Sequence, residues 1–473
     1  MWIAIRFPLL PLEVFLRGSS TPEPFAVEEH HCVLTCDRKA AARGVRAGMG
    51  TSAALALAPN LRVMPRDPAG ETEALLGIAS WAGQFTPGVA LEFPSIVLLE
   101  AAGSMKLFHG LEALVASLRR GVADLGYDAV MAGAPTPRAA SWLALAGEQK
   151  FIGSAVKLEA ALAALPVEVL SNYDGIREDL QAIGVLTLGD LRGLPREGVA
   201  RRFGQALLDD LDRASGRLPD PRNFFVPPER FRAGIELPAE VTQAETLAFA
   251  ARRLVVQLAG FLAARSGGVQ RFTLKLAHRD ASPTEIAVGL VAPSRDAEHF
   301  TLLLRERLGS LALREPVRSL ALEADAAMPL PGSDRPLLLE EGKPPGRWEP
   351  LVERLRARLG ADAVHGLACR AEHRPERAVA IVEPGASQAK LGFGERPLWL
   401  LESPRPLREI GGVPHHDGPL DLVAGPERIE SGWWDGDDVF RDYFIARTQD
   451  QSLVWIFCDR GRKGGWYLHG VFA

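Results

Sequence analysis

The sequence predicts an α+β protein of several domains, and three observations lead to this prediction. The chain has 473 residues, which at about 100–200 residues per domain is enough for three or four domains. Hydrophobic residues make up 47% and charged residues 24%, as in ordinary globular proteins. Strand and helix patterns alternate in the first part of the chain, whereas the last part is rich in aromatic residues and strand patterns.

Residues 1–160 are predicted to form the first α+β domain. A strand begins at Trp2, and the Ala/Arg-rich segment 38–58 reads as two short helices separated by glycines. The remaining elements expected in this domain are a β run at 33–36, a strand at 89–101 interrupted by Pro94, a helix at 111–125, a strand at 127–132 and a helix at 138–145.

Residues 161–220 read as an all-helical domain that contains a helix-hairpin-helix. The hairpin turn is Ile183-Gly184-Val185, and Thr187 is the expected N-cap of the second helix. Backbone N–H groups at such a turn can bind a phosphate of DNA without regard to base sequence. The alternative is a tight turn that only packs this domain.

Residues 221–330 begin with a proline-rich tether and then predict the order βαββαβ. Two helices on one face of a four-stranded sheet leave the other face free, and Arg271 and Lys275 lie on that free face. They are candidates for contact with a duplex backbone, the alternative being an ordinary solvated strand. Residues 229–330 contain 13 Lys+Arg and 12 Asp+Glu, so DNA binding should be weak and sensitive to salt.

Residues 331–396 read as a proline-rich linker, and residues 397–473 as a β-rich module with a meander of three strands. Five tryptophans of this module are expected to build a small β core rather than a base-stacking platform. Its outer surface is a candidate docking site for partner proteins. The five are Trp399, Trp433, Trp434, Trp455 and Trp466.

Several segments resemble Y-family (DinB/UmuC-like) lesion-bypass DNA polymerases. Val33–Met49 is similar to the entrance of the fingers, and Ser95–Gly110 and Gly133–Ala146 are similar to a palm strand and the palm helix after it. The helix-hairpin-helix and the βαββαβ unit follow in the order of thumb and little finger. The resemblance covers residues 1–330 and implies a polymerase-like palm and fingers, a helical thumb and a little finger.

Three short motifs near the C-terminus resemble the extension found in the polymerase-like component of bacterial mutagenesis cassettes. They are Arg428–Gly436, Arg441–Phe444 and Trp466–Gly470. The resemblance implies three protein partners: ImuA, an error-prone DnaE-type polymerase and the sliding clamp (the β subunit). Damaged or primed DNA is the fourth expected partner.

The carboxylates that a polymerase needs are absent from the matching positions. Nucleotidyl transfer requires two divalent metals held by acidic side chains. Counting back from Glu13 places Ala4 and Arg6 at the two ligand positions of the first strand. Counting back from Glu100 places Ser95 and Ile96 at those of the second. Residues 2–11 contain no carboxylate at all, so the loss there does not depend on the alignment.

The nucleotide pocket implied by the resemblance is lost as well. Arg38 and Ala41 stand where the family has its Tyr and Arg, and Trp142 stands where it has a lysine, although Arg138 keeps a charge one turn earlier. Five acids in this region are interpreted as solvated or structural groups. They are Glu13, Asp37, Asp67, Glu92 and Glu100.

The segment Gln388–Phe393 resembles the bacterial clamp-binding peptide. Leu391 and Phe393 would fill an apolar pocket and Gln388 would anchor the peptide by hydrogen bonds. Ala389 departs from the usual leucine, which weakens the match.

The remaining features narrow the class of protein. Four cysteines are too few for a disulfide framework, which favours a reducing cytoplasm. Cys32 and Cys36 lack a second ligand pair, and neither a metal site nor a cofactor is expected. No apolar run of about 18 residues is apparent, so no membrane span is expected. The formal net charge of -5 argues mildly against strong DNA binding.

Three hypotheses follow from the sequence. The preferred one is a non-catalytic, polymerase-like scaffold of SOS mutagenesis and translesion synthesis that links the clamp, ImuA and a DnaE-type polymerase. An active translesion polymerase with displaced carboxylates would need Glu13, Glu92 or Glu100 to lie within about 4 Å of one another. A plain DNA-binding repair factor would not need the clamp peptide.

Overall fold

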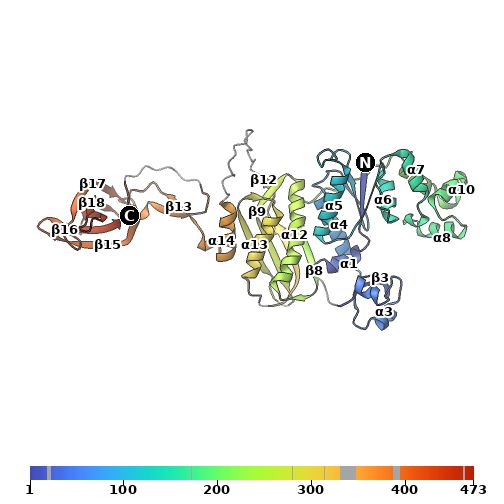
Figure 1. Ribbon diagram of the computed structural model, residues 1–473, viewed down its shortest axis with the longest axis horizontal. Helices are drawn as coiled ribbons and strands as arrows, with labels where there is room; N and C mark the ends of the chain where they lie inside the picture. Colours follow the sequence, from blue (N-terminus) through green and yellow to red (C-terminus); the bar gives the residue numbers. More distant parts are fainter. Residues whose placement is uncertain are drawn as a thin grey trace. The chain divides into compact units, whose positions relative to one another are not determined.

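The computed structural model describes residues 1–18, 23–171, 173–279, 281–313, 315–330, 348–386, 395–461 and 464–472. The chain divides into two compact units, Met1–Arg358 and Leu359–Ala473. Each unit has its own sheets and cores (Figure 1).

The palm of the first unit is a four-stranded antiparallel sheet in the order β5-β6-β1-β7. Side chains alternate between its two faces. Ile3 and Ile5 face a core shared with helices α1, α4 and α5, whereas Ala4 faces a core shared with α6 and the thumb. The elements are β1 (Trp2–Arg6), α1 (Leu10–Leu16), α4 (Pro68–Ala82), β5 (Val89–Glu92), β6 (Ile96–Glu100), α5 (Leu111–Leu125), β7 (Val130–Ala134) and α6 (Pro137–Leu145).

The fingers are a small lobe inserted after α1, with a three-stranded sheet in the order β3-β2-β4. The predicted pair of short helices is confirmed, because Gly44 and Gly48 adopt positive φ between them. The elements are β2 (Phe25–Glu29), β3 (Cys32–Cys36), α2 (Arg38–Ala42), α3 (Thr51–Leu57) and β4 (Arg62–Pro65).

The thumb is helical, as predicted, and its apolar side chains join the palm core on the α6 side of the sheet. Its elements are α7 (Ala155–Ala163), a 3-10 turn at Val167–Val169, α8 (Asp174–Ala182), α9 (Leu188–Gly193), α10 (Arg196–Phe203) and α11 (Gln205–Ser215). The tether that follows runs along the palm, where the Phe225 N–H donates to the Val89 carbonyl over 2.7 Å.

The little finger has the predicted βαββαβ order, and its sheet runs β10-β9-β11-β8. Its elements are β8 (Arg232–Val241), α12 (Ala244–Ala264), β9 (Gly267–His278), β10 (Thr284–Ser294), α13 (Ala297–Gly309) and β11 (Val317–Ala324), with a short β12 (Met328–Pro329) beside β9. A further helix, α14 (Glu349–Leu359), adds Ala357 to this core.

Helix α12 alone among the described helices has the length and apolar composition of a membrane span. Ten of its residues are buried. It packs on β8, β9 and β11 with one side and on palm helices α4 and α5 with the other. Its apolar composition therefore follows from its place as a core helix of the first unit.

The second unit contains a six-stranded antiparallel sheet in the order β16-β15-β20-β19-β18-β17 and a separate two-stranded sheet. The three strands of the predicted meander are present as β18, β19 and β20, but the sheet is twice as large as predicted. The elements are β13 (Gly366–Cys369), β14 (Val379–Val382), β15 (Trp399–Ile410), β16 (Val413–His415), β17 (Asp421–Ser431), β18 (Val439–Arg447), β19 (Leu453–Asp459) and β20 (Trp466–Val471).

Candidate functional site

The four positions that lack carboxylates lie on strand β1 and at the start of its neighbour β6, with Ser95 immediately before β6. In the antiparallel pairing of β1 and β6, Arg6 stands opposite Ile96 and Ala4 stands opposite Leu98. The Ser95 carbonyl accepts a hydrogen bond from the Phe7 N–H over 2.9 Å. The chain thus brings together the places that would carry metal ligands, but with an alanine, an arginine, a serine and an isoleucine in them.

This part of the palm is packed with apolar side chains. Ala4 is fully buried and Ile96 is 3% exposed, and both belong to a core that includes Trp142 of helix α6. Magnesium needs oxygen ligands and keeps several waters, so it has no place among these groups. The absence of acids is therefore matched by the packing around the positions where they are missing.

The Arg6 guanidinium binds the C-terminal end of helix α6. Its Nη1 donates to the carbonyl of Leu145, the last residue of α6, over 2.9 Å. Carbonyl groups at the C-terminus of a helix carry partial negative charge and lack partners within the helix, so a guanidinium is favourable there. Burial lowers the pKa of Arg6, yet its charge still opposes any divalent cation at this position.

The acids near the palm do not gather. Glu92 accepts from Ser141 over 3.1 Å and pairs with Arg222 over 2.8 Å. Glu100 lies 3.7 Å from the N-terminal amino group. Asp37 and Asp67 are N-caps that accept from Ala40 and Gly70, respectively.

Glu13 has a structural partner of its own. It is buried, and its Oε1 accepts from the Asp128 N–H over 2.6 Å. In the described ranges, no group of three His, Cys, Asp or Glu side chains could hold a metal. Cys32 and Cys36 are free thiols.

The residues that stand in the nucleotide pocket serve other purposes. Trp142 is buried in the core beside the thumb, and Arg38 is exposed on α2. Arg138 lies 3.3 Å from Asp210 of the thumb and 3.7 Å from Glu92 of the palm. Its charge therefore ties the palm to the thumb.

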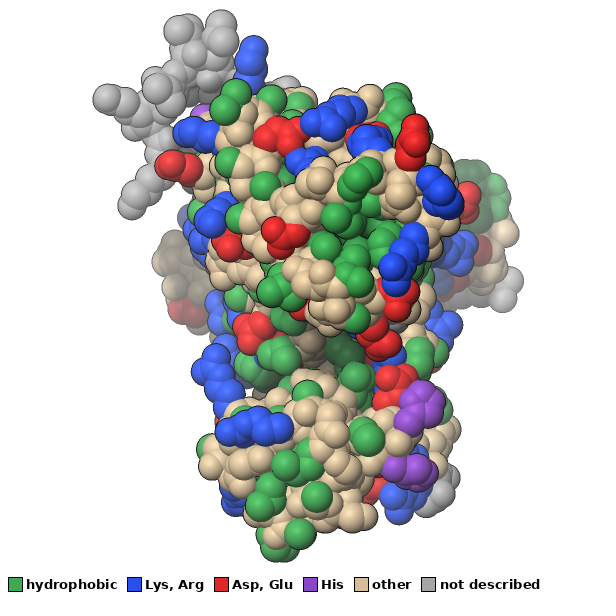
Figure 2. Space-filling view, turned by 90° about the vertical axis from the view of Figure 1, so that its right-hand side faces the viewer, with side chains coloured by type: hydrophobic (Ala, Val, Ile, Leu, Met, Phe, Trp, Pro, Cys, Tyr) green, Lys and Arg blue, Asp and Glu red, His purple; other side chains and the backbone are tan. Residues whose placement is uncertain are grey.

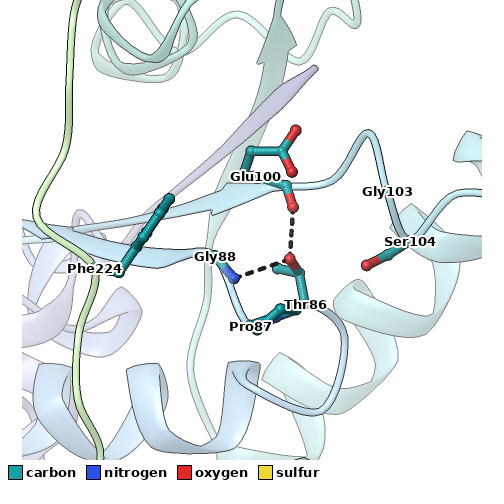
Figure 3. A pocket seen from close by; sticks show the side chains of 7 residues that line it. All are labelled: Thr86, Pro87, Gly88, Glu100, Gly103, Ser104 and Phe224. Atoms are coloured by element: carbon teal, nitrogen blue, oxygen red, sulfur yellow. Dashed lines mark hydrogen bonds between the residues drawn. The ribbon is translucent and has the colours of Figure 1, made fainter.

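A cavity of about 440 Å³ lies at the end of β5 and β6 (Figure 3). Thr86 Oγ1 donates to the Glu100 carbonyl over 2.6 Å and accepts from the Gly88 N–H over 3.1 Å. Phe224, from the tether, closes one side and stacks on Trp2 with ring centroids 6.3 Å apart. These hydrogen bonds join the segment between α4 and β5 to the end of β6, and the tether packs against the cavity through Phe224.

The predicted hairpin has the expected shape, but its backbone N–H groups already donate to acceptors within the thumb. Thr187 caps α9, as the sequence predicts, and it also forms a capping box with Asp190. The N–H groups of Ile183, Gly184 and Val185 donate to carbonyls of Leu180 and Gln181 over 3.0–3.2 Å. The Asp190 carboxylate accepts from the N–H groups of Leu186 and Thr187. A DNA phosphate would have to displace these contacts, and DNA binding here stays a prediction.

The two residues of the little finger predicted to face DNA have different surroundings. Lys275 lies 2.8 Å from Glu323 and 3.6 Å from Glu285, both on strands beside its own, and these acids raise its pKa. Arg271 is exposed. Over the face that carries the thumb and fingers, Figure 2 shows basic and acidic side chains intermixed. The contact of Arg271 and Lys275 with DNA stays a prediction.

The clamp-binding residues Gln388, Leu391 and Phe393 lie outside the described residues. Their role stays a prediction from the sequence.

Comparison with known proteins covers nearly the whole chain. The model of the impB/mucB/samB family matches residues 17–144. Protein ImuB of Caulobacter vibrioides, from strain NA1000 / CB15N and from strain ATCC 19089 / CIP 103742 / CB 15, is 28% identical over 458 residues, which is 91% of this chain and 100% of the relative. The chain is an ImuB homologue. The impB/mucB/samB match includes Ser95 and Ile96 and begins after Ala4 and Arg6.

Solved polymerase structures also align with this ImuB homologue. A Dbh ternary complex with partially disordered substrates aligns with a TM-score of 0.39 and 16% identity, over 69% of this chain and 100% of that chain. DinB from Sulfolobus solfataricus aligns with a TM-score of 0.38 and 16% identity, over 70% of this chain and 99% of that chain.

In the C-terminal unit of the ImuB homologue, the second and third tail motifs lie on strands β18 and β20 of one sheet, and the first begins on β17 and continues into the loop after it. Arg441 Nη1 donates to the Tyr443 hydroxyl over 3.0 Å, and that hydroxyl lies 2.7 Å from Nδ1 of the buried His469. Burial lowers the pKa of His469 to about 4 and keeps it neutral near pH 7. Hydrogen bonds between these polar side chains thus connect the second and third motifs within the aromatic core.

The first motif is joined to a segment that the sequence analysis did not single out. Arg374 is 1% exposed, and its Nη1 and Nη2 lie 3.0 and 2.7 Å from the two carboxylate oxygens of Asp435. Glu372 pairs with Arg374 over 2.8 Å and accepts from Ser431 over 3.2 Å. These partners come from about 60 residues earlier, so sequence spacing gives no sign of them.

The expectation that the tail tryptophans build a core is wrong for three of them. Trp455 is buried and stacks on Tyr443, with ring centroids 4.0 Å apart. Trp399, Trp433 and Trp434 are 70%, 74% and 59% exposed. Trp399 stands at the start of β15, and the other two lie in the loop between β17 and β18.

Proposed function

We propose that this ImuB homologue is a non-catalytic, polymerase-like scaffold that acts in the cytoplasm in SOS mutagenesis and translesion synthesis. It links the sliding clamp, ImuA and an error-prone DnaE-type polymerase at damaged DNA. The homology to ImuB supports the link to DNA damage.

One observation carries the non-catalytic part of the proposal. At the two ligand positions of β1, Ala4 is fully buried in apolar core and Arg6 donates its guanidinium to the end of α6. Two-metal catalysis needs converging carboxylates and room for hydrated cations. Catalysis by displaced acids would require at least two of Glu13, Glu92 and Glu100 to converge, and each has a separate structural partner.

We expect the purified full-length chain to extend no primer on a primed template with four nucleotides and either magnesium or manganese. An active Y-family polymerase in the same buffer is the positive control, and circular dichroism verifies that the chain is folded. The variant E92Q neutralises the palm acid that pairs with Arg138 of α6 and Arg222 of the tether. Extension by the wild-type chain that disappears in E92Q would show that the chain is an active polymerase.

A further inference from the structure

The loop between β17 and β18 presents two adjacent tryptophans to solvent. Trp433 is 74% exposed and Trp434 is 59% exposed, and their rings meet edge to face with centroids 4.6 Å apart. Tryptophan is the largest side chain and is usually well buried. Exposed aromatic clusters of this kind mark sites of association, since tryptophan is enriched among residues that dominate binding energy.

The loop is held in place by a buried arginine. Arg374 bridges the carboxylate of Asp435 and the carbonyl of Asp437, the latter over 3.0 Å. Its guanidinium also lies 5.6 Å from the centre of the Trp434 ring. A side chain at Gly432, which has φ +98°, would clash with the Asp437 carbonyl. The backbone that carries the tryptophans is therefore fixed before any partner arrives, which lowers the entropy cost of binding.

The surroundings of the tryptophans are acidic. Four acids lie in or beside the loop, and two arginines stand against them, so the local charge is negative. The acids are Glu430, Asp435, Asp437 and Asp438, and the arginines are Arg374 and Arg377. Asp437 is 62% exposed and pairs with Arg377 over 2.7 Å.

We propose that residues 432–438, here named the tryptophan loop, dock into an apolar socket on a partner protein, and that lysine and arginine side chains surround this socket. The inference rests on the proposed function, because a scaffold needs such a partner. Charge complementarity selects the partner: a basic rim would meet the acidic loop favourably, whereas nucleic-acid phosphates would be repelled. The edge-to-face arrangement also leaves no pair of parallel ring faces for stacked bases.

The test compares W433A/W434A with W399A in the full-length chain. Trp399 is a matched control, because it is an exposed tryptophan of the same unit that stands on β15. The probes are the purified ImuA and DnaE-type polymerase of the same organism, with binding measured by calorimetry. We expect W433A/W434A to weaken the binding of one probe by at least about 30-fold, as for paired aromatic hot spots, and W399A by less than about threefold. Thermal unfolding should be unchanged in both variants.

Each other outcome would overturn the inference. Binding that survives W433A/W434A would overturn it alone and leave the scaffold intact. Loss of self-association in sedimentation, with probe binding unchanged, would assign the loop to a second copy of the chain. Loss of binding to a labelled single-stranded oligonucleotide would assign it to nucleic acid. A wild-type chain that binds neither protein would overturn both this inference and the partner part of the proposed function.

Discussion

At the scale of single residues, Glu13 is the most perturbed acid of the palm. It is 9% exposed, its Oε1 accepts from the Asp128 N–H, and its Oε2 is buried without a hydrogen-bond partner among the described residues. Burial raises the pKa of Glu13 to about 8. A carboxyl of this kind is neutral in the folded state near pH 7 but ionised in the unfolded chain.

The pH dependence of stability follows from this difference. Because the folded state holds the proton more tightly, the free energy of unfolding falls as pH rises from about 4.5 to about 8. We expect E13Q to lack this pH dependence. Its melting temperature should therefore rise relative to that of the wild type as pH increases from about 4.5 to about 8. Each pKa unit corresponds to about 1.4 kcal/mol. A difference in melting temperature between E13Q and wild type that stays constant from pH 5 to pH 8 would contradict the raised pKa of Glu13.

At the scale of elements, the contact between α12 and the palm depends on small residues. Trp81 of α4 lies between Gly121 of α5 and Gly260 of α12, and a Cβ atom at either glycine would collide with its ring. Close approach of helices requires such positions. The little finger is thus packed against α4 and α5 of the palm through a bulky ring that only glycine neighbours leave room for.

We expect G121A to destabilise the first unit by about 1–3 kcal/mol, the usual cost of overpacking a core. G198A is the matched control, because Gly198 lies in helix α10 with open space around its Cα. Alanine there should be neutral or should stabilise by about 0.5–1 kcal/mol. Chemical denaturation of both variants measures the difference. Equal stability of the two would mean that the Trp81 contact is looser than described.

The sequence predicts some elements better than others, for physical reasons. The helix at 111–125 is found with its predicted bounds, because one of its faces is apolar and the other polar. Helix α4 was not predicted, since its second half is buried on nearly all sides and shows no clear periodicity. Strand β15 contains Pro404 and Pro406, which discourage a strand prediction.

The sequence likewise predicts one part of the candidate site and not another. The loss of carboxylates is visible in the sequence, because Ala4 and Arg6 are simply not acids. The burial that fills the place of the metals comes from α6, whose packing on β1 depends on contacts more than 130 residues apart. The Arg374–Asp435 pair likewise joins residues 61 positions apart. Such pairs are brought together by the tertiary fold, and no local pattern in a single sequence reveals them.

At the scale of the whole molecule, two of the predicted DNA contacts agree with the prediction of weak DNA affinity. Lys275 is shared between Glu285 and Glu323, and the thumb hairpin has its N–H groups engaged. Phosphate contacts made by free cations supply most non-specific affinity for DNA. If DNA binding is as weak as predicted, the proposed scaffold needs another way to stay at damaged DNA, and binding to the sliding clamp would provide it.

The peptide at 388–393 is predicted to bind the clamp. A tether to the clamp turns weak DNA binding into an intramolecular event at high effective concentration. We expect Q388A/L391A/F393A to abolish binding to the purified clamp in surface plasmon resonance, because all three anchors of the peptide are removed. K390A changes a residue between the anchors and should bind within about threefold of wild type. Clamp binding that persists in the triple variant would mean that another part of the chain holds the clamp, and that the scaffold is tethered through its folded units.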